Sequence, residues 1–293
     1  MGIREVVVVS GKGGTGKTTV TAALATLLRE GVVVDADVDA PNMHILLKPQ
    51  VKESHRFKGG FVAEIDKETC QGCGKCHELC RFEAIIPPAN GESYQVDQVA
   101  CDGCGLCQLA CPSGAVAMVQ KEAGWWYRSD TRCGPFFHAL LNPGEDNSGK
   151  LVTQIRTAAR EFAQGQGLKR VLIDGPPGIG CPVISSLTGV SAALVVVEPT
   201  PSGMHDARRI VELASTFNIE LHLLVNRFDI NEGITNKIEG WCRERGIRPA
   251  GRIPLDPEIP RLLSEGKTPL EAGGRTRETL ENLYFLLFDQ EGR

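Results

Sequence analysis

Residues Ser10 to Thr19 combine glycines, lysines and hydroxyl groups at a spacing that suits phosphate binding. Gly11 to Thr18 fits the pattern G-x-x-x-x-G-K-[ST]. Glycines let backbone N–H groups curl around phosphate oxygens, Lys17 would reach the β- and γ-phosphates, and the Thr18 hydroxyl would ligate Mg²⁺. The predicted nucleotide contacts of this loop are Gly11, Gly13, Gly14, Thr15, Gly16, Lys17, Thr18 and Thr19.

Eight of the eleven cysteines fall in two runs of identical spacing, 31 positions apart. This is the spacing of bacterial two-cluster ferredoxins, in which the fourth cysteine of each run ligates the other cluster. We therefore predict two [4Fe–4S] clusters. Cluster I would take Cys70, Cys73, Cys76 and Cys111, and cluster II would take Cys101, Cys104, Cys107 and Cys80.

Two other uses of these cysteines compete with iron–sulfur clusters. Zinc usually takes four ligands with a wider gap between pairs, and disulfides do not persist in the reducing compartment that the composition indicates. Four glycines inside the runs would let tight loops aim N–H groups at cluster sulfurs, namely Gly72, Gly74, Gly103 and Gly105. Arg81 stands where proline often follows the fourth cysteine, but it removes no ligand.

Acidic residues follow two apolar runs that read as buried parallel strands. Asp35, Asp37 and Asp39 come after the first run, and Asp174-Gly-Pro-Pro-Gly178 comes after the second. Ligands of α/β sheets bind at the carboxyl ends of the strands. Asp174 would hold Mg²⁺ through a water, and Gly178 would offer its N–H to the γ-phosphate. The alternatives are a plain strand-to-turn connection and, for Asp39, capping of the next helix.

A second lysine, Lys12, follows the first glycine of the loop. The sequence K-G-G-T-G-K-T-T resembles the deviant Walker A motif of the MinD/Mrp/nitrogenase-iron-protein class of ATPases. The resemblance implies that Lys12 crosses a dimer interface to the phosphates bound by the partner; a solvated lysine is the alternative. It also implies that Asp37 positions the attacking water or the Mg²⁺ shell, with Asp39 as its substitute. The implied catalytic residues are Lys12, Lys17, Asp37 and Asp39.

Two further features are interpreted through the same resemblance. Asn226-Arg-Phe-Asp229 is similar to the base-contact motif of this class and to the N-K-x-D of GTPases; Arg227 in place of lysine favours adenine. Residues Ile253 to Asp256, with Pro254 as the predicted contact, would cap the base from the other side. Cys181 lies at the offset of a cluster cysteine in the nitrogenase iron protein, so Cys133 and Cys181 could form a third, intersubunit metal site, although a small buried residue is favoured for Cys181.

The motifs between residues 10 and 229 occur in the order of MinD-superfamily P-loop ATPases that carry an inserted two-cluster ferredoxin domain. The resemblance implies a slow ATPase, stimulated by a partner or by redox state, that uses ATP, Mg²⁺ and two [4Fe–4S] clusters. It also implies a homodimer or paralogue heterodimer through the nucleotide, and a redox or metal-cofactor partner protein. Electron transfer is the favoured function, with cluster or metal-cofactor maturation and MinD-like positioning as alternatives.

Composition limits the other classes of function. The chain has 293 residues, 42% of them hydrophobic, and a net charge of −4, which argues against a general nucleic-acid binder. The sequence shows neither a signal peptide nor an apolar run of transmembrane length, so we expect a cytoplasmic protein without membrane insertion. The C-terminal tail is apolar but acidic, unlike the basic membrane-targeting helices of MinD.

These residues need elements that bring them together. Buried strands are predicted at 6–9, 32–35, 171–174, 192–198, 220–226 and 251–255, an edge strand at 61–65, and helices at 20–28, 150–164, 203–217 and 234–245. The fold class is therefore α/β, a doubly wound and mainly parallel sheet with a small inserted α+β ferredoxin-like domain. The predicted domains are residues 1–60 and 123–293 for the P-loop ATPase and 61–122 for the insert.

Overall fold

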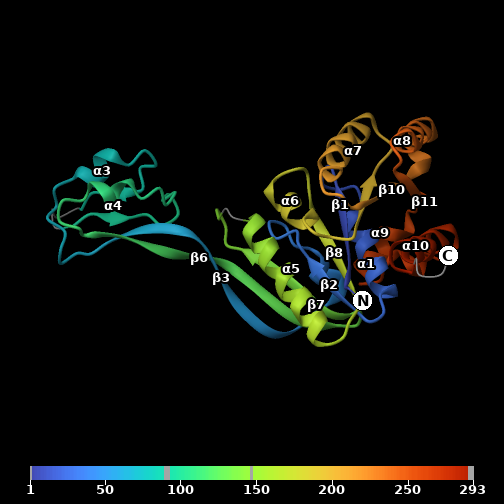
Figure 1. The fold of residues 1–293 in the computed structure, drawn as a ribbon, viewed down its shortest axis with the longest axis horizontal. Coiled ribbons are helices and arrows are strands. Elements are labelled where there is room, and N and C mark those ends of the chain that lie inside the picture. Colours follow the sequence, from blue (N-terminus) through green and yellow to red (C-terminus); the bar gives the residue numbers. More distant parts are fainter. Residues whose placement is uncertain (1, 89–92, 146–147, 290–293) are drawn as a thin grey trace. The chain divides into compact units, whose positions relative to one another are not determined.

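A computed structural model describes residues 2–88, 93–145 and 148–289 of the chain (Figure 1). Contacts divide it into two compact units. The first comprises Met1–His55, Trp126–Leu140 and Ser148–Arg293, and the second comprises Arg56–Trp125 and Leu141–Asn147. The second unit contains both cysteine runs, and it extends past the predicted insert boundaries of 61 and 122. Residues 146 and 147 of the motif Gly144–Val152, which contributed to the resemblance, lie outside the described residues.

A nine-stranded sheet has the order β11-β10-β9-β1-β8-β2-β7-β6-β3. Neighbours from β11 to β7 pair in parallel. The prediction of an α/β fold with a large, mostly parallel sheet is confirmed. The six strands at its centre and one edge are β1 Arg4–Ser10, β2 Gly31–Asp35, β8 Arg170–Pro177, β9 Ala192–Val197, β10 Glu220–Asn226 and β11 Arg248–Ile253.

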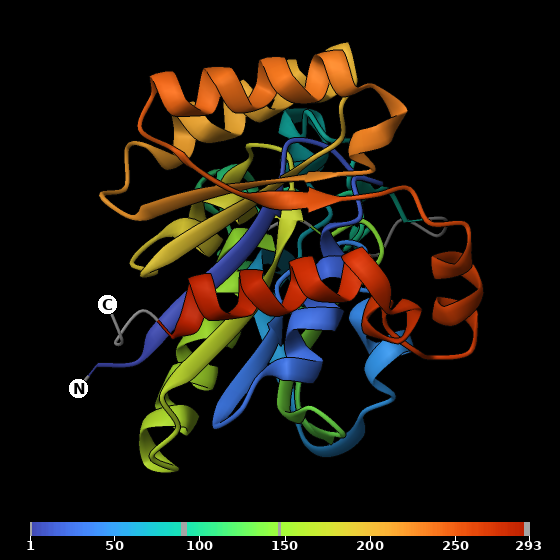
Figure 2. The same cartoon turned by 90° about the vertical axis from the view of Figure 1, so that its right-hand side faces the viewer.

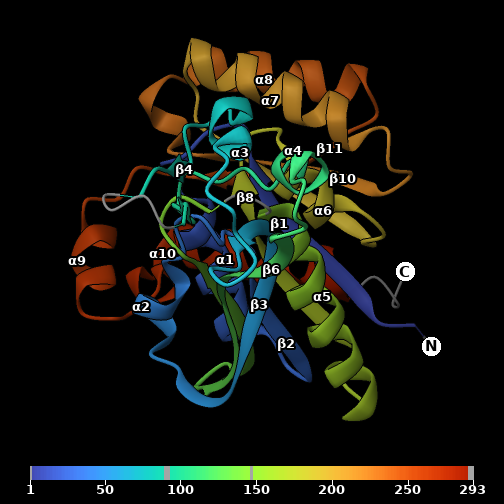
Figure 3. The ribbon, with the colours of Figure 1, turned by 90° about the vertical axis from the view of Figure 1, so that its left-hand side faces the viewer.

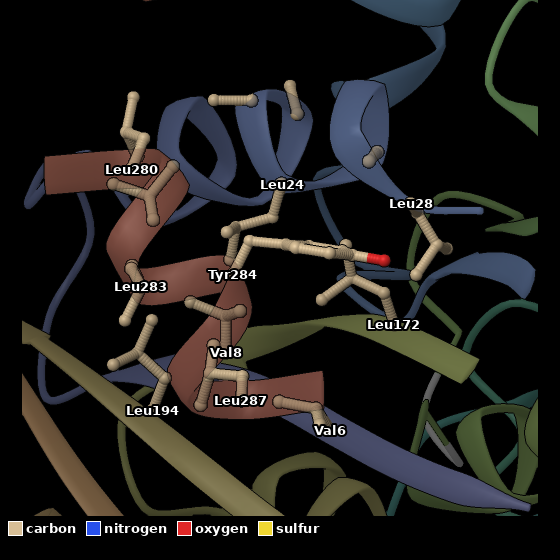
Figure 4. Close-up of a cluster of buried hydrophobic side chains, with 14 of the residues drawn as sticks. Val6, Val8, Leu24, Leu28, Leu172, Leu194, Leu280, Leu283, Tyr284 and Leu287 are labelled. Atoms are coloured by element: carbon tan, nitrogen blue, oxygen red, sulfur yellow. The ribbon is translucent and has the colours of Figure 1, made fainter. Parts of the chain in front are cut away.

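The central strands are nearly continuous apolar runs because helices cover both faces of the sheet. Val6 and Val8 of β1 point to the face where α1 (Lys17–Leu27) and α10 (Gly274–Phe288) pack side by side (Figures 2 and 4). On the opposite face, α5 (Ser148–Gly165) packs against α6 (Cys181–Leu187) and lies on β2 and β8.

The apolar side of the C-terminal tail belongs to this core. Leu280, Leu283 and Leu287 of α10 are fully buried there (Figure 4). Within the described residues, no helix is long and apolar enough to cross a membrane. The remaining helices of the first unit are α2 Met43–Leu47, α7 Pro201–Ala214, α8 Glu232–Glu244 and α9 Glu258–Ser264, with 3-10 turns at Phe228–Ile230 and Pro269–Ala272.

The other edge of the sheet differs most from the sequence prediction. It consists of β7 (Gly134–Leu141), β6 (Val116–Thr131) and β3 (Gln50–Ile65). The prediction of a strand limited to 61–65 was wrong in length, because β3 begins at Gln50. The last strand was also misplaced, since β11 ends at Ile253 rather than Leu255.

The second unit repeats one local structure twice, as the duplicated cysteine runs predict. Helix α3 (Lys75–Leu79) corresponds to α4 (Leu106–Ala110), and the two helices pack together (Figure 3). Between them, β4 (Ile85–Ile86) and β5 (Gln95–Val96) pair antiparallel. Its small core is formed by Ala63, Ile85, Cys107 and Val116. This unit buries few apolar side chains, so its stability should depend on groups bound by its thiols.

A buried histidine in β7 gives a stability prediction. Burial, assisted by the charge of His44, lowers the pKa of His138 from 6.5 to about 4. In the unfolded chain His138 therefore becomes protonated below pH 6.5, whereas in the folded chain it stays neutral down to about pH 4. This effect should make the protein about 2 kcal/mol less stable at pH 5 than at pH 7.

The control is His138→Gln, which keeps a polar group beside Ser129, whose Oγ lies 3.0 Å from His138 Nε2. Urea unfolding at both pH values should show a flatter pH dependence for this variant than for the wild type. Equal dependence in the two proteins would contradict the prediction.

Candidate functional site

The glycine-rich loop adopts a backbone that only glycine accepts easily. Gly14 and Gly16 have φ of 81° and 88°, and α1 begins immediately afterwards at Lys17. The loop is also tightly packed, because a Cβ at Gly16 would lie 2.3 Å from Asn226 Nδ2. The Asn226 side chain donates a hydrogen bond of 2.8 Å to the Thr15 carbonyl. The buried Thr15 Oγ1 has no hydrogen-bond partner among the described residues. The loop is therefore preformed as an anion-binding cradle at a helix N-terminus.

Lys17 connects the loop to the two acidic segments. Its Nζ lies 3.0 Å from Asp174 Oδ2 and 3.8 Å from Asp37 Oδ2, and all three side chains are largely buried. Asp174 also accepts hydrogen bonds from Thr18 at 2.7 Å and from Thr21 at 2.8 Å. The predicted Mg²⁺ ligands Thr18, Asp37 and Asp174 therefore meet around one ammonium group. Their hydroxyl and carboxylate oxygens form a donor set that suits Mg²⁺.

Asp35 was expected at the ligand-binding end of the sheet with Asp37 and Asp39, but it is fully buried in the structure. Burial, followed by the charge of Asp174, raises the pKa of Asp35 to about 8. Its carboxyl oxygens accept the N–H groups of Asp37 and Met43, both at 3.2 Å. Asp35 therefore contacts the N-terminus of α2, whereas Asn42, and not Asp39, occupies the N-cap position. The position of Asp35 directly after the apolar run marks a carboxylate at the strand end, but no local pattern predicts its contact with Met43.

An open cavity of about 730 Å³ lies over the loop and the acidic segments. Burial raises the pKa of Asp37, which faces this cavity, although the charge of Lys17 opposes the shift. The predicted residues that line the cavity are Gly13, Gly14, Thr15, Gly16, Lys17, Thr18, Thr19, Asp37, Asp39 and Arg227. The cavity is also lined by residues that were not predicted, namely Ser10, Ala40, Asn42, Ser148, Pro176, Pro177, Gly180 and Pro182.

Three predicted phosphate contacts lie outside that lining. Lys12 points its Nζ to Ser202 Oγ at 3.2 Å. Gly11 packs closely on α7, where a Cβ would come within 2.5 Å of the Asp206 backbone. The N–H of Gly178 donates to the Ser10 carbonyl at 2.9 Å, so it must be released before it can meet a phosphate. Their contacts with nucleotide remain predictions.

A second, more apolar pocket adjoins the cavity through Gly16, Thr19 and Arg227. Asn226 and Pro254, both predicted base contacts, line it together with leucine, isoleucine and proline side chains. The Oδ1 atom of Asp229 accepts the N–H of Leu255 at 2.7 Å. That carboxylate therefore holds the backbone of Leu255 at the pocket wall, and the preference for adenine over guanine remains a prediction.

In the second unit, one cavity brings together thiols from both runs. It is lined by Cys80 of the first run and by Cys101, Cys104 and Cys107 of the second, with Cys76 also at its wall. The first four are the predicted ligands of cluster II. Burial raises the pKa of Cys107, and the charges of Cys101 and Cys104 add to the rise. The neutral thiol is therefore favoured in this environment, and thiolates would need the positive charge of iron to stabilise them there.

Backbone hydrogen bonds cross between the two halves in a matching way. The Asp97 N–H donates to Ala84 O, and the Asp66 N–H donates to Ala115 O, both at 2.8 Å. Asp97 O in turn accepts the Cys101 N–H, and Asp66 O accepts the Cys70 N–H. The start of the first run therefore lies beside the segment that follows Cys111, and the start of the second run lies beside the segment that follows Cys80.

The loops around the thiols also match the sequence expectation. The four glycines of the two runs have positive φ, at Gly72, Gly74, Gly103 and Gly105. The Ala115 N–H donates to Cys111 Sγ at 3.3 Å, and the Ser113 hydroxyl lowers the pKa of the Cys111 thiol. Among the described residues, no three His, Cys, Asp or Glu side chains are arranged to hold a single metal ion as they stand. The donor set fits iron–sulfur clusters, and their presence remains a prediction.

Cys133 and Cys181 lie apart within one chain. Cys133 precedes β7, which runs parallel to β2, and packs on the core with its Sγ 3.9 Å from Thr26 Oγ1. Cys181 begins α6, beyond the carboxyl end of β8, and it is exposed, so the interpretation as a small buried residue was wrong. Since β2 and β8 are also parallel, the two cysteines lie at opposite ends of the sheet. The proposed third site is not assembled within one chain.

Comparisons with known proteins agree with this geometry. The model of the CobQ/CobB/MinD/ParA nucleotide binding domain matches residues 6–270. Uncharacterized protein MJ0578 of Methanocaldococcus jannaschii is 31% identical over 96% of this chain and 95% of its own length. The cytosolic Fe-S cluster assembly factor NUBP2 of Bos taurus is 25% identical over 91% of this chain and 84% of its own length. The septum site-determining protein MinD of Pyrococcus horikoshii, solved with Mg-ADP, has the same fold, with a TM-score of 0.55 at 19% identity, covering 99% of this chain and 98% of that one.

Proposed function

Because the chain belongs to the CobQ/CobB/MinD/ParA nucleotide-binding family, we propose that it binds and hydrolyses ATP in the cavity beside Lys17. The backbone N–H groups of the loop and the Lys17 ammonium would bind the phosphates. Thr18 and Asp174 would hold Mg²⁺, which supplies positive charge to the phosphate oxygens. Asp37, buried at the cavity wall, would orient the attacking water.

We further propose that the second unit holds two [4Fe–4S] clusters, which supply one-electron redox chemistry when bound. The observation that carries this proposal is that Cys80 lines the same cavity as Cys101, Cys104 and Cys107. A duplicated sequence with four ligands per run could equally have placed each site within its own run. The crossed cavity supports the ferredoxin-type arrangement instead.

The two activities would be coupled through a dimer that closes on ATP. Lys12 carries a positive charge at the edge of the nucleotide cavity, and its contact with Ser202 is an exposed hydrogen bond that is easily exchanged. A partner's phosphates could therefore attract it. Closure and reopening would change how the clusters are presented to a redox partner.

Cluster assembly is the second candidate, because the relative NUBP2 is named as an Fe-S cluster assembly factor. In that case iron would leave the protein during turnover. The complete set of eight cysteines favours resident clusters, as in ferredoxins.

One experiment separates the two candidates. The ATPase rate is measured on the holoprotein with the clusters oxidised and reduced, while transfer of labelled iron to an apo-ferredoxin is followed. Electron transfer predicts a redox-dependent rate and no iron transfer. Iron that moves in proportion to ATP turnover would establish the assembly function instead.

Lys12→Ala tests the dimer. The variant should bind ATP as a monomer with nearly the wild-type dissociation constant, because Lys12 does not line the nucleotide cavity of its own chain. It should no longer dimerise when ATP is added. Analytical ultracentrifugation with and without ATP measures this, with Lys12→Arg as the charge-conserving control. A Lys12→Ala variant that still dimerises with ATP would refute the proposed role.

A further inference from the structure

The cavity that contains the predicted cluster II ligands has an exposed apolar rim. Leu79, Phe82 and Leu106 line the cavity, and each is 42–44% exposed. Leu109 lies three residues beyond Leu106 on α4, therefore on the same side of that helix, and is 86% exposed. We call these four side chains the apolar rim. Large apolar side chains so exposed, and grouped around one opening, indicate an interaction surface.

The duplication provides an internal comparison for this rim. Residues 31 positions away occupy the same places in the other half of the unit. The counterparts of Leu106 and Leu109 are Lys75 and Glu78, both exposed. The counterparts of Leu79 and Phe82 are Ala110 and Ser113. The two-cluster fold therefore does not require an apolar rim, since the other half has polar or small residues in the same positions.

The cavity inside the rim also holds little charge. Within the described chain, Asp102 is the only lining residue of the cavity, apart from the cysteines, that can carry charge. The exposed charges beside the rim in the sequence are of mixed sign, at Glu78, Arg81 and Glu83, so they do not form a surface of one sign for a complementary partner. Four side chains are also far fewer than the roughly 20 to 30 residues per partner of a stable interface. Their extent suits a brief redox encounter better than a permanent dimer.

We infer that the apolar rim docks a soluble electron-transfer protein that presents an apolar, uncharged face around its own redox centre. This inference rests on the proposed function, because it assumes that cluster II is resident. One electron would leave this protein and reduce the partner's centre. Cluster II would thus be the point of electron exchange, and the polar side next to cluster I would not.

The probe is a designed four-helix haem protein in two versions. The apolar version has leucine and alanine around the haem edge, and the lysine version has lysine there. The holoprotein is reduced with dithionite, and stopped-flow absorbance follows ferric haem becoming ferrous. Transfer to the apolar version should be the faster and nearly independent of ionic strength. Leu109→Glu should lower its second-order rate constant about tenfold and raise the dissociation constant of the oxidised pair similarly. The matched control Glu78→Gln, in the equivalent place of the other half, should change neither.

Three outcomes would overturn the inference. The first is an unchanged rate constant of electron transfer for Leu109→Glu, and the second is a faster, salt-dependent transfer to the lysine version. The third is a smaller sedimentation coefficient for Leu109→Glu than for the wild type, which would show that a second copy of this chain covers the rim. Cluster absorbance and its bleaching by dithionite are recorded in the same samples. Wild-type protein without reducible clusters would overturn the proposed function itself, and the inference with it.

Discussion

Lys17→Met should lower the rate of ATP hydrolysis at least 100-fold, on the order of the loss when one preorganised charge-stabilising donor is removed. The same change should destabilise the nucleotide-free protein. Lys17 is 6% exposed and lies 3.0 Å from Asp174, which is fully buried. Removing the lysine leaves a buried carboxylate without its cation, which costs about 3 kcal/mol of unfolding free energy.

A second substitution separates the two effects. The double variant Lys17→Met/Asp174→Asn has no unpaired buried carboxylate at this position, and the asparagine amide can still form hydrogen bonds with Thr18 and Thr21. The double variant should regain most of the lost stability in urea unfolding, yet it should not bind ATP in calorimetric titration. Lys12→Met is the control, because Lys12 is not buried, and its unfolding free energy should equal that of the wild type within about 0.5 kcal/mol.

Two results would count against this account. Normal ATP binding by Lys17→Met would mean that the loop is not the phosphate site. Failure of Asp174→Asn to restore stability would mean that the instability comes from elsewhere, for example from the space left by the lysine side chain.

The sequence predicted the centre of the sheet and the loop because both depend on local signals. The run Val6–Val9 is apolar at every position, which only a strand covered on both faces requires. The loop needs glycine where φ is positive, as at Gly14 and Gly16, and that requirement is visible in the residue type itself.

The long edge strands could not be predicted in the same way. Most residues of β3 between Gln50 and Arg56 are exposed, so neither an apolar run nor a clear alternation distinguishes them from a loop. These residues are strand because they pair with neighbours that are distant in sequence. Such pairing leaves no local signal in the residues themselves.

Within the site, the acidic segment shows the same limit. Capping by Asp39 was the alternative prediction because Asp39 lies just before the mainly apolar residues 43–47. In the structure it is Asp35 that contacts the helix, because its carboxylate accepts a hydrogen bond from the Met43 N–H, eight residues away. The chain bends at residues 39 and 40 between them, and no periodic pattern predicts that bend.

Cys80→Ala should remove cluster II and leave cluster I, although Cys80 belongs to the first run. Its thiol lines the cavity of the second run. Iron content should fall by about half, or less where a three-iron cluster persists without the fourth ligand. Iron analysis and electron paramagnetic resonance of the reduced protein measure the loss. The control is the double variant Cys133→Ala/Cys181→Ala, whose iron content should be unchanged.

Pairs of substitutions distinguish crossed from uncrossed ligation. If Cys80 and Cys107 hold the same cluster, Cys80→Ala/Cys107→Ala should lose no more clusters than either single variant. Cys80→Ala/Cys76→Ala should instead lose both clusters, because Cys76 is predicted to ligate cluster I. Uncrossed ligation predicts the reverse order of the two double variants. The crossed hydrogen bonds Asp97 N–H to Ala84 and Asp66 N–H to Ala115 hold the two halves in the arrangement that favours the first result.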